Sequence, residues 1–384
     1  MNKTLIITYF VILFSCASCF NRGTDCQVIQ VDNSNIEDEL SAGEYLDTCY
    51  YNLIQLKNTP IPIGDITKIK FIDDKFFVFD EFTQSISVFK ENGDVLLYLS
   101  KQGKAKSEYL EITDFSYSNE HIYIYDKAYN RISVYDLKGE FKKIIDTSRY
   151  WAHTIFLIDD DIYMINVYSE SETGKYLIFK VDQNGNLLDK FLPFDKTVRQ
   201  FSDEYCCNVG NEFFYGQKPD NIIYRIDKAK CEKVFKIDFT MDKMPEEYWK
   251  LDDREIMLKG IQKKYVSGIS RLYASTNRIF VYYLDKNWDE NLIVINMMNN
   301  VVEHVCKGLS FENFPFYTPL LHPIINKEYL YSTIDHDRFG DLAGYLIKFP
   351  KDEFSKEYIK DIKNLYDLYE ENTNPVIVKL KIKE

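Results

Sequence analysis

The sequence predicts an all-β fold, a six-bladed β-propeller built from four-stranded blades. Residues 77–93 return as residues 123–139, shifted by 46 positions, and their closing turn returns again at 180–186. Periods of roughly 40 to 50 residues are typical of propeller blades or helical arrays. Strands are favoured because the repeats contain short alternating runs, such as EHIYIYD over residues 120–126, bounded by turn residues. The 30 Tyr and 27 Phe agree, since aromatic residues suit half-buried pleated surfaces.

The register of the repeat is strict. The matched pairs are Asp80 and Asp126, Ile86 and Ile132, Val88 and Val134, and Gly93 and Gly139. Asn92 and Gly93 mark a hairpin turn. Weaker copies lie at residues 224–230 and, after an insertion, at 293–299. Each period holds four short strands, which together make one propeller blade.

Six blades can be placed along the chain. Their ranges are 63–100, 111–146, 153–193, 205–239, 269–308 and 320–384. Two helical insertions are expected. The segment 245–266 opens with Pro and acidic residues, and apolar residues recur at helical spacing over 352–372. No second domain of normal size is expected.

The two ends of the chain are predicted to meet in the last blade. Residues 50–57 form a lone strand before the repeats, and residues 376–382 form a strand after Asn374 and Pro375. Pairing these strands closes the ring and removes exposed sheet edges. The propeller is therefore expected to span residues 49–384.

Residues 1–15 are predicted to be a lipoprotein signal peptide. Lys3 gives a positive start, and the apolar run over residues 5–14 is too short to span a bilayer. Residues 13–16 (LFSC) resemble a bacterial lipobox, so Cys16 is the predicted lipid attachment site and Cys19 is the alternative. Ordinary cleavage without a lipid is the other possibility. The polar residues 16–48 are then predicted to form a flexible tether between membrane and propeller.

The formal net charge of −13 argues against nucleic acid as a partner, because phosphate binding requires clustered cations. One short cluster of basic residues is expected to lie in a solvated loop; it consists of Lys101, Lys104 and Lys106. Apart from Cys16 and Cys19, which belong to the predicted export segment, the six remaining Cys show no CxxC spacing that would indicate zinc. An exported protein could form disulfides, but free thiols are the favoured interpretation for the Cys outside the leader.

The repeat at residues 123–135 resembles an NHL-type repeat, through Asp126, Asn130, Arg131 and Ile132. The chain over residues 45–384 is also similar to the six-bladed propeller lipoproteins of Bacteroidota. The shared features are the Ile-Gly-x-Ile opening at 63–66, Glu108 and Tyr109 before the second blade, and the Asn-Pro-aliphatic strand from 374. The resemblance implies the fold and a place in the bacterial cell envelope, lipid-anchored on a periplasmic or cell-surface face. It implies little about activity.

Catalytic signatures such as GxSxG, HExxH, Walker and GxGxxG motifs do not occur in the sequence. Asp80 and Asp126 follow strands, where Asp side chains commonly bond backbone N–H groups and hold a turn. A structural role is therefore expected for both carboxylates.

A candidate ligand site comes from propeller geometry, since the first strand of each blade lines the central channel. Reading one polar residue from each first strand gives Lys68, Asp114, His153, Tyr205, Arg271 and His322. The hypothesis is that some of these residues converge on a ligand at the channel mouth. The alternative is that they are separate, solvated channel residues.

Two function classes follow from these observations. The first is a membrane-tethered binding or scaffold module for a glycan, peptide or protein ligand, without catalysis or cofactor. The second is an enzyme of the lyase or lactonase type, which would need a central Ca²⁺ or Zn²⁺ as Lewis acid. For that metal, Asp114, His153 and His322 are the ligand candidates.

Overall fold

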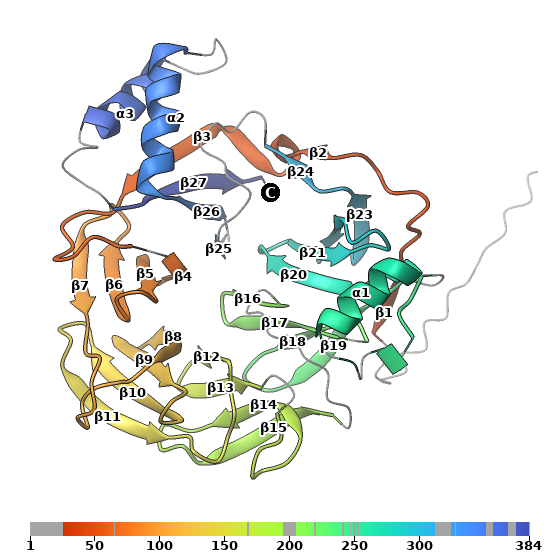
Figure 1. Cartoon of the computed structure of the whole chain (residues 1–384), viewed down its shortest axis with the longest axis horizontal. Helices are drawn as coiled ribbons and strands as arrows, with labels where there is room; N and C mark the ends of the chain where they lie inside the picture. Colours follow the sequence, from red (N-terminus) through yellow and green to blue (C-terminus); the bar gives the residue numbers. More distant parts are fainter. Residues whose placement is uncertain are drawn as a thin grey trace, which may run out of the picture.

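The computed structural model describes residues 26–383, except residues 65, 167–168, 195–204, 219, 240–241, 246, 249–250, 252, 312–323, 327, 351–355 and 368–373. Six sheets of four or five strands surround a central axis, which confirms the six-bladed propeller, and a separate two-stranded sheet lies outside these blades (Figure 1). In each blade the first strand lies innermost and the fourth lies farthest from the axis, except in blade 4, where a fifth strand lies outside the fourth. The predicted signal peptide, Cys16 and Cys19 lie outside the described residues.

The first three blades each come from one continuous stretch. Blade 1 is β4 (Ile66–Ile72), β5 (Lys75–Asp80), β6 (Ser85–Lys90) and β7 (Val95–Leu99). Blade 2 is β8 (Ile112–Ser118), β9 (His121–Asp126), β10 (Arg131–Asp136) and β11 (Phe141–Asp146). Blade 3 is β12 (Thr154–Ile158), β13 (Asp161–Ile165), β14 (Tyr176–Val181) and β15 (Leu187–Pro193).

Blades 4 to 6 are less regular. Blade 4 is β16 (Cys206–Val209), β17 (Glu212–Gln217), β18 (Ile222–Ile226) and β19 (Cys231–Asp238), with β1 (Gln27–Gln30) as a fifth strand. Blade 5 is β20 (Gly268–Ala274), β21 (Arg278–Leu284), β22 (Glu290–Asn296) and β23 (Val301–Cys306). Blade 6 is β25 (Ile324–Asn326), β26 (Tyr329–Ile334), β27 (Val376–Ile382) and β3 (Leu46–Gln55).

Blade 6 joins the two ends of the chain. Strand β27 pairs antiparallel with β3, with Val376 opposite Gln55 and Leu380 opposite Tyr51. A buried hydrogen bond also runs from Ile63 N–H to Asn374 Oδ1, which links blade 6 to the entry of blade 1. The ring is therefore closed by main-chain pairing between segments more than 300 residues apart.

The expected flexible tether over residues 16–48 is wrong for its described part. Strand β1 pairs parallel with β19, and β2 (Leu40–Ser41) pairs parallel with β24 (Leu309–Ser310). Between them, Glu37 N–H donates to Val305 O. We call residues 26–41 the strap, since they run along the outer edges of blades 4 and 5. The polar composition of the strap suggested a flexible segment. Main-chain hydrogen bonds instead hold the strap against the blades, and the side chains of Ile29 and Val31 are buried.

Helices interrupt the ring at two places. Helix α1 (Asp253–Lys263) lies between blades 4 and 5, and α3 (Lys356–Asp367) lies inside blade 6, as the sequence predicts. Helix α2 (His336–Lys348) is an addition to that prediction, and Asp335 caps it by accepting the N–H of Arg338. None of the helices in the described part of the chain has the length and apolar character needed to cross a bilayer.

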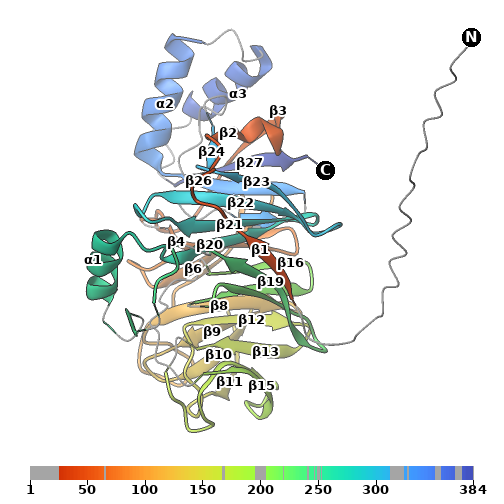
Figure 2. The same cartoon turned by 90° about the vertical axis from the view of Figure 1, so that its right-hand side faces the viewer.

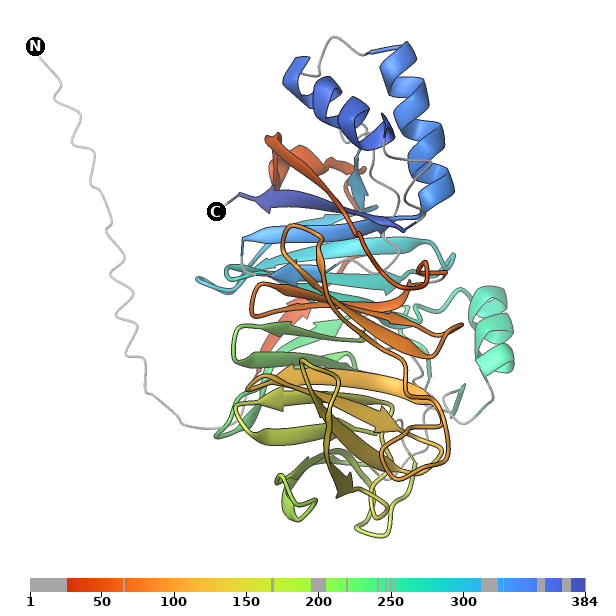
Figure 3. The same cartoon turned by 90° about the vertical axis from the view of Figure 1, so that its left-hand side faces the viewer.

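The two faces of the ring differ. Figures 2 and 3 show α1 and α2 on one side, which we call the insertion face. The turns between first and second strands and between third and fourth strands lie on the other side, the hairpin face. The strap begins at the hairpin face, where Gln27 Nε2 donates to the carbonyl of Asn300 in the β22–β23 turn.

The core lies between adjacent blades, where aromatic rings interlock. Phe77 of blade 1 packs on Tyr117 of blade 2, with ring centroids 4.6 Å apart. Phe156 of blade 3 stacks on Phe213 of blade 4 at 3.5 Å. Each such pair contributes about 0.5–1.5 kcal/mol beyond the area it buries. The many Tyr and Phe therefore hold neighbouring blades together.

Candidate functional site

The central channel contains a cavity of about 750 Å³, lined by residues of the described part of the chain. Residues of all six first strands line it, from β4, β8, β12, β16, β20 and β25. A ligand in this channel would therefore contact every blade, as expected for a propeller.

Strand register places three of the sequence-predicted site residues at corresponding positions of their blades. Lys68 lies opposite Phe79, Asp114 opposite Tyr125, and Arg271 opposite Tyr282, which are corresponding positions of the second strands. In blade 3 the corresponding residue is Thr154, opposite Ile165. His153 lies one position before it, and its backbone N–H donates to Ile165 O. His322 lies outside the described residues.

Asp114 is the centre of a buried cluster. Its side chain is fully buried, and its Oδ1 accepts hydrogen bonds from Lys68 Nζ at 2.8 Å and Lys70 Nζ at 3.1 Å. Its Oδ2 accepts the backbone N–H of Ile155 in blade 3 at 2.7 Å. The carboxylate therefore joins blades 1, 2 and 3. Binding a metal through Asp114 would require replacing these partners.

Lys70 is the site residue that sequence reasoning missed. It lies two positions after Lys68, so both side chains point to the same side of β4. Its ammonium lies 4.8 Å from the centroid of the Phe115 ring and also donates to the Phe115 carbonyl. The spacing of two in KIK was the available signal, but only the structure shows that both lysines meet one carboxylate.

The other predicted residues have contacts within their own blades. Arg271 forms an ion pair with Glu290 and stacks over the Tyr282 ring, 4.8 Å from its centroid. Tyr205 lies under the ammonium of Lys218 at 5.1 Å. The structure thus joins Lys68 to Asp114 and places Arg271 and Tyr205 in separate clusters of blades 5 and 4.

The opposite end of the channel is acidic. Asp73, Asp74 and Asp159 line it at the hairpin face, in the turns between first and second strands. Asp159 pairs with Lys228 at 2.8 Å. The channel therefore carries cations in the half nearer the insertion face and carboxylates at the hairpin face. Within the described residues, no group of three or more His, Cys, Asp or Glu side chains is placed to hold a metal ion.

Asp80 and Asp126 have the structural role expected from the repeat. Asp80 accepts the N–H groups of Gly64 at 2.9 Å and Thr83 at 3.2 Å. Asp126 accepts those of Leu110 at 2.8 Å and Tyr129 at 3.3 Å. Each carboxylate fixes the entry of its blade and the next turn, and both are buried.

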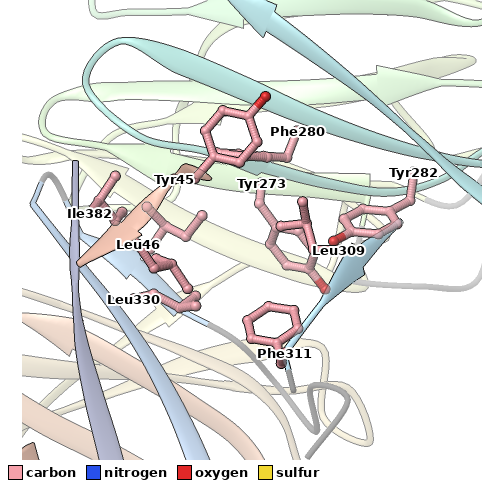
Figure 4. Close-up of a pocket in the computed structure, with 10 residues that line it drawn as sticks. Tyr45, Leu46, Tyr273, Phe280, Tyr282, Leu309, Phe311, Leu330 and Ile382 are labelled. Carbon is pink, nitrogen blue, oxygen red and sulfur yellow. The ribbon is translucent and has the colours of Figure 1, made fainter. Parts of the chain in front are cut away.

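A small apolar pocket of about 40 Å³ lies between blades 5 and 6, beside the channel (Figure 4). Tyr273 and Ile325 line both cavities. Burial raises the pKa of Tyr282 to about 12 and also raises the pKa of Tyr45 well above its usual range. Both phenols therefore stay neutral at physiological pH, and this pocket presents only uncharged groups.

The described cysteine side chains are free thiols, in agreement with the sequence interpretation. They are Cys26, Cys206, Cys207, Cys231 and Cys306. Cys206 and Cys207 line the channel wall but pack into different clusters on opposite faces of β16. Burial raises the pKa of the Cys231 thiol to about 12 and raises that of Cys207 as well. These thiols are therefore poor nucleophiles at neutral pH.

Solved structures are similar to this chain to different degrees. A protein of Bacteroides fragilis described as exported is 14% identical over 93% of this chain and 100% of its own, with a TM-score of 0.69. A DUF4221 family member from Bacteroides vulgatus is 12% identical, covers 87% of this chain and 97% of its own, and has a TM-score of 0.45. Streptogramin B lyase is 14% identical, with coverages of 76% and 82% and a TM-score of 0.41.

At 14% identity the likeness to the Bacteroides fragilis protein shows the fold alone, and the other two likenesses are too weak to support a conclusion. No protein of curated function matches the sequence. A family model does match, described as a domain of unknown function (DUF4934), over residues 27–381. This match includes the strap, all six blades and the helical insertions, so the chain belongs to the DUF4934 family.

Proposed function

We propose that this protein is an exported, membrane-anchored binding protein that holds its ligand in the central channel. The observation that carries the proposal is the channel itself, about 750 Å³ in volume and lined by all six blades, with a cationic cluster inside it. The N-terminal leader and the likeness to an exported protein of Bacteroides fragilis support export.

The strap supports a defined orientation at the membrane. It begins at the hairpin face, and the segment from Cys16 to Cys26 reaches at most about 36 Å when fully extended. A lipid on Cys16 would hold the hairpin face toward the bilayer and leave the insertion face accessible.

Binding without catalysis is favoured over the lyase or lactonase alternative. Asp114, one of the three candidate metal ligands, has both carboxylate oxygens engaged by Lys68, Lys70 and the Ile155 N–H. Metal analysis of the purified protein tests this preference. We expect less than stoichiometric Ca²⁺ or Zn²⁺, and one equivalent of either metal would favour the enzyme.

Lipid labelling tests the anchor. The full chain is expressed in a bacterial host with an alkyne fatty acid, alongside Cys16→Ser and Cys19→Ser. We expect label and membrane association for the natural chain and for Cys19→Ser, and loss of both for Cys16→Ser. Loss of label and membrane association in Cys19→Ser alone would assign the lipid to Cys19. A natural chain that carries no label and does not associate with the membrane would contradict anchoring.

A further inference from the structure

We infer that the insertion face over blades 1, 2 and 3 is an interaction surface for an acidic polysaccharide. Four segments form this surface, which we call the rim: residues 81–84, 100–111, 127–130 and 146–153. They contain turns between second and third strands and connections between blades, and both kinds lie on the insertion face. The rim lies outside the cavity of the central channel, so this inference goes beyond the proposed function and does not depend on it.

Hydrogen bonds between the four segments make the rim one continuous surface. The three blades are neighbours around the ring (Figure 1), and each segment is tied to the next. The bonds run from Tyr109 Oη to Gln84 O at 2.8 Å, from Arg131 Nη2 to Glu108 O at 2.7 Å, and from Asn130 Nδ2 to Tyr150 O at 2.8 Å. Side chains of different blades therefore face one partner at the same time.

The rim is locally basic in an acidic protein. Five cationic side chains are exposed on it, namely Lys101, Lys104, Lys106, Lys127 and Arg149. Within the part of the chain that the structure describes, none of these five charged groups has an ion-pair or hydrogen-bond partner. The exposed carboxylates of the rim are fewer, namely Glu81, Glu111 and Asp146. Because the whole chain has a net charge of −13, a cationic surface on one face complements an anionic partner there.

Three aromatic rings are exposed on the same surface. Phe82 is 88% exposed, Trp151 44% and Tyr129 38%. The guanidinium of Arg131 lies 4.4 Å from the centroid of the Tyr129 ring and orients it. The rings belong to the turn of blade 1, the turn of blade 2 and the entry of blade 3. A partner that contacts all three rings must therefore be an extended chain.

The backbone on both sides of Trp151 is held in place. The carbonyl of Tyr150 accepts Asn130 Nδ2, and the N–H of Ala152 donates to the Tyr125 hydroxyl at 3.3 Å. Tyr150 and Ala152 are buried, so the Trp151 ring projects from an anchored segment. A ring presented in this way loses little conformational entropy when a ligand stacks on it.

Lysines combined with separate exposed rings favour an acidic polysaccharide over a protein or a nucleic acid. Pyranose rings have apolar C–H faces that stack on aromatic rings, and uronate carboxylates pair with ammonium groups. Lysine is depleted in protein interfaces, whereas four of the five rim cations are Lys. A nucleic acid duplex carries one charge per about 1.7 Å of helix axis, which the carboxylates among the rim cations and the net charge of −13 would repel.

Calorimetry at low salt on the purified full chain tests the inference. The acidic probes are hexagalacturonate and a hyaluronan hexasaccharide, compared with neutral maltohexaose and with monomeric galacturonate. We expect at least one acidic hexasaccharide to bind about tenfold more tightly than maltohexaose and the monomer, with an affinity that falls as salt rises. No binding of either acidic hexasaccharide at millimolar concentration, or equal binding of maltohexaose, would overturn the inference.

Two further probes separate the classes of macromolecule. Hexaglutamate represents an acidic protein segment, and a single-stranded hexanucleotide represents a nucleic acid. Both should bind more weakly than the better acidic hexasaccharide, because neither matches spaced carboxylates to stacked sugar rings. If hexaglutamate or the oligonucleotide binds as tightly or more tightly, the polysaccharide assignment is wrong.

Matched charge variants locate the site. Three rim lysines are removed in K101Q/K104Q/K106Q, and three exposed lysines of the hairpin face are removed in K90Q/K228Q/K230Q. Both variants change the net charge equally. The rim variant should weaken binding about tenfold and reduce its salt dependence, whereas the hairpin-face variant should leave both unchanged. Equal losses in the two variants, or no loss in the rim variant, would contradict the site.

Ring variants test the stacking. Phe82→Ala and Trp151→Ala should each weaken binding about fivefold without changing its salt dependence, and Trp151→Phe should restore most of the loss. Met298→Ala, which shortens an exposed side chain of the hairpin face, is the control. Unchanged binding in both alanine variants would remove the rings from the site. These variants alter no residue of the channel wall, so failure here would leave the proposed channel function standing.

Discussion

Blades 1 and 2 and blade 6 reach the same four-stranded sheet by different routes. Blades 1 and 2 are continuous, and their registers match strand for strand, with irregularities at Ile66/Lys68 and at Ile112/Asp114. Blade 6 combines a three-residue first strand, an inserted pair of helices and strands from both ends of the chain.

The difference shows which signals are local. In blades 1 and 2, Asp80 and Asp126 fix each blade entry from 16 residues away. Asn374 of blade 6 instead accepts the N–H of Ile63 at the entry of blade 1, 311 positions away. Such contacts form late, because loop-closure entropy opposes long-range pairing. Blade 6 should therefore be the element on which the integrity of the whole ring depends.

The largest expected effect is at the closing strand. Val378 of β27 is fully buried, so Val378→Asp would place an unpaired charge in the core of blade 6. We expect a loss of at least about 4 kcal/mol, enough to abolish the cooperative unfolding transition or the soluble yield. Urea denaturation measures it, with the exposed Lys381→Asp on the same strand as a near-neutral control. A stable Val378→Asp protein would show that closure is dispensable.

Two equivalent turn glycines, in blades 1 and 2, test how strongly a regular blade depends on contact with blade 6. Gly93 and Gly139 occupy the same turn with φ of +85° and +77°, which favours glycine. A Cβ on Gly93 would lie 2.0 Å from the carbonyl oxygen of Gln55, at the end of β3 in blade 6. On Gly139 the nearest atom to an added Cβ is a Leu97 side-chain carbon at 3.3 Å.

Gly93→Ala should therefore cost about 3 kcal/mol, from backbone strain and overpacking, and Gly139→Ala about 1 kcal/mol, from strain alone. Thermal unfolding of both variants measures the difference. Equal losses would mean that the turn of blade 1 does not depend on its contact with blade 6.

An effect smaller than that of Gly93→Ala is expected at the buried Asp of a regular blade. Asp126→Ala leaves the Leu110 and Tyr129 N–H groups without their acceptor. We expect a loss of about 2 kcal/mol, measured by urea denaturation, with the exposed Glu111→Ala as control. A loss as large as that of Val378→Asp would show that blades 1 and 2 are no more self-sufficient than blade 6.

Part of the candidate site could be predicted because the first strands are short and their register is fixed by the turns that follow. That reasoning named Lys68 and Asp114, which the structure joins by a hydrogen bond. It missed Lys70, chose His153 where the register selects Thr154, and assigned Asp114 to a ligand although protein partners occupy it. Side-chain partners across blades depend on the twist and spacing of neighbouring sheets, which no local pattern encodes.

By itself, the sequence determined the six β-modules, the two strands that close the ring and the structural Asp in the repeats. These depend on alternation, turn residues and a constant period, all of which act within one blade. Only the tertiary structure decided that residues 26–41 pair with blades 4 and 5, that two lysines meet one buried carboxylate, and that the channel is cationic at one end and acidic at the other. Those features arise when strands distant in sequence are brought together around one axis, so they depend on distances that a linear pattern does not contain.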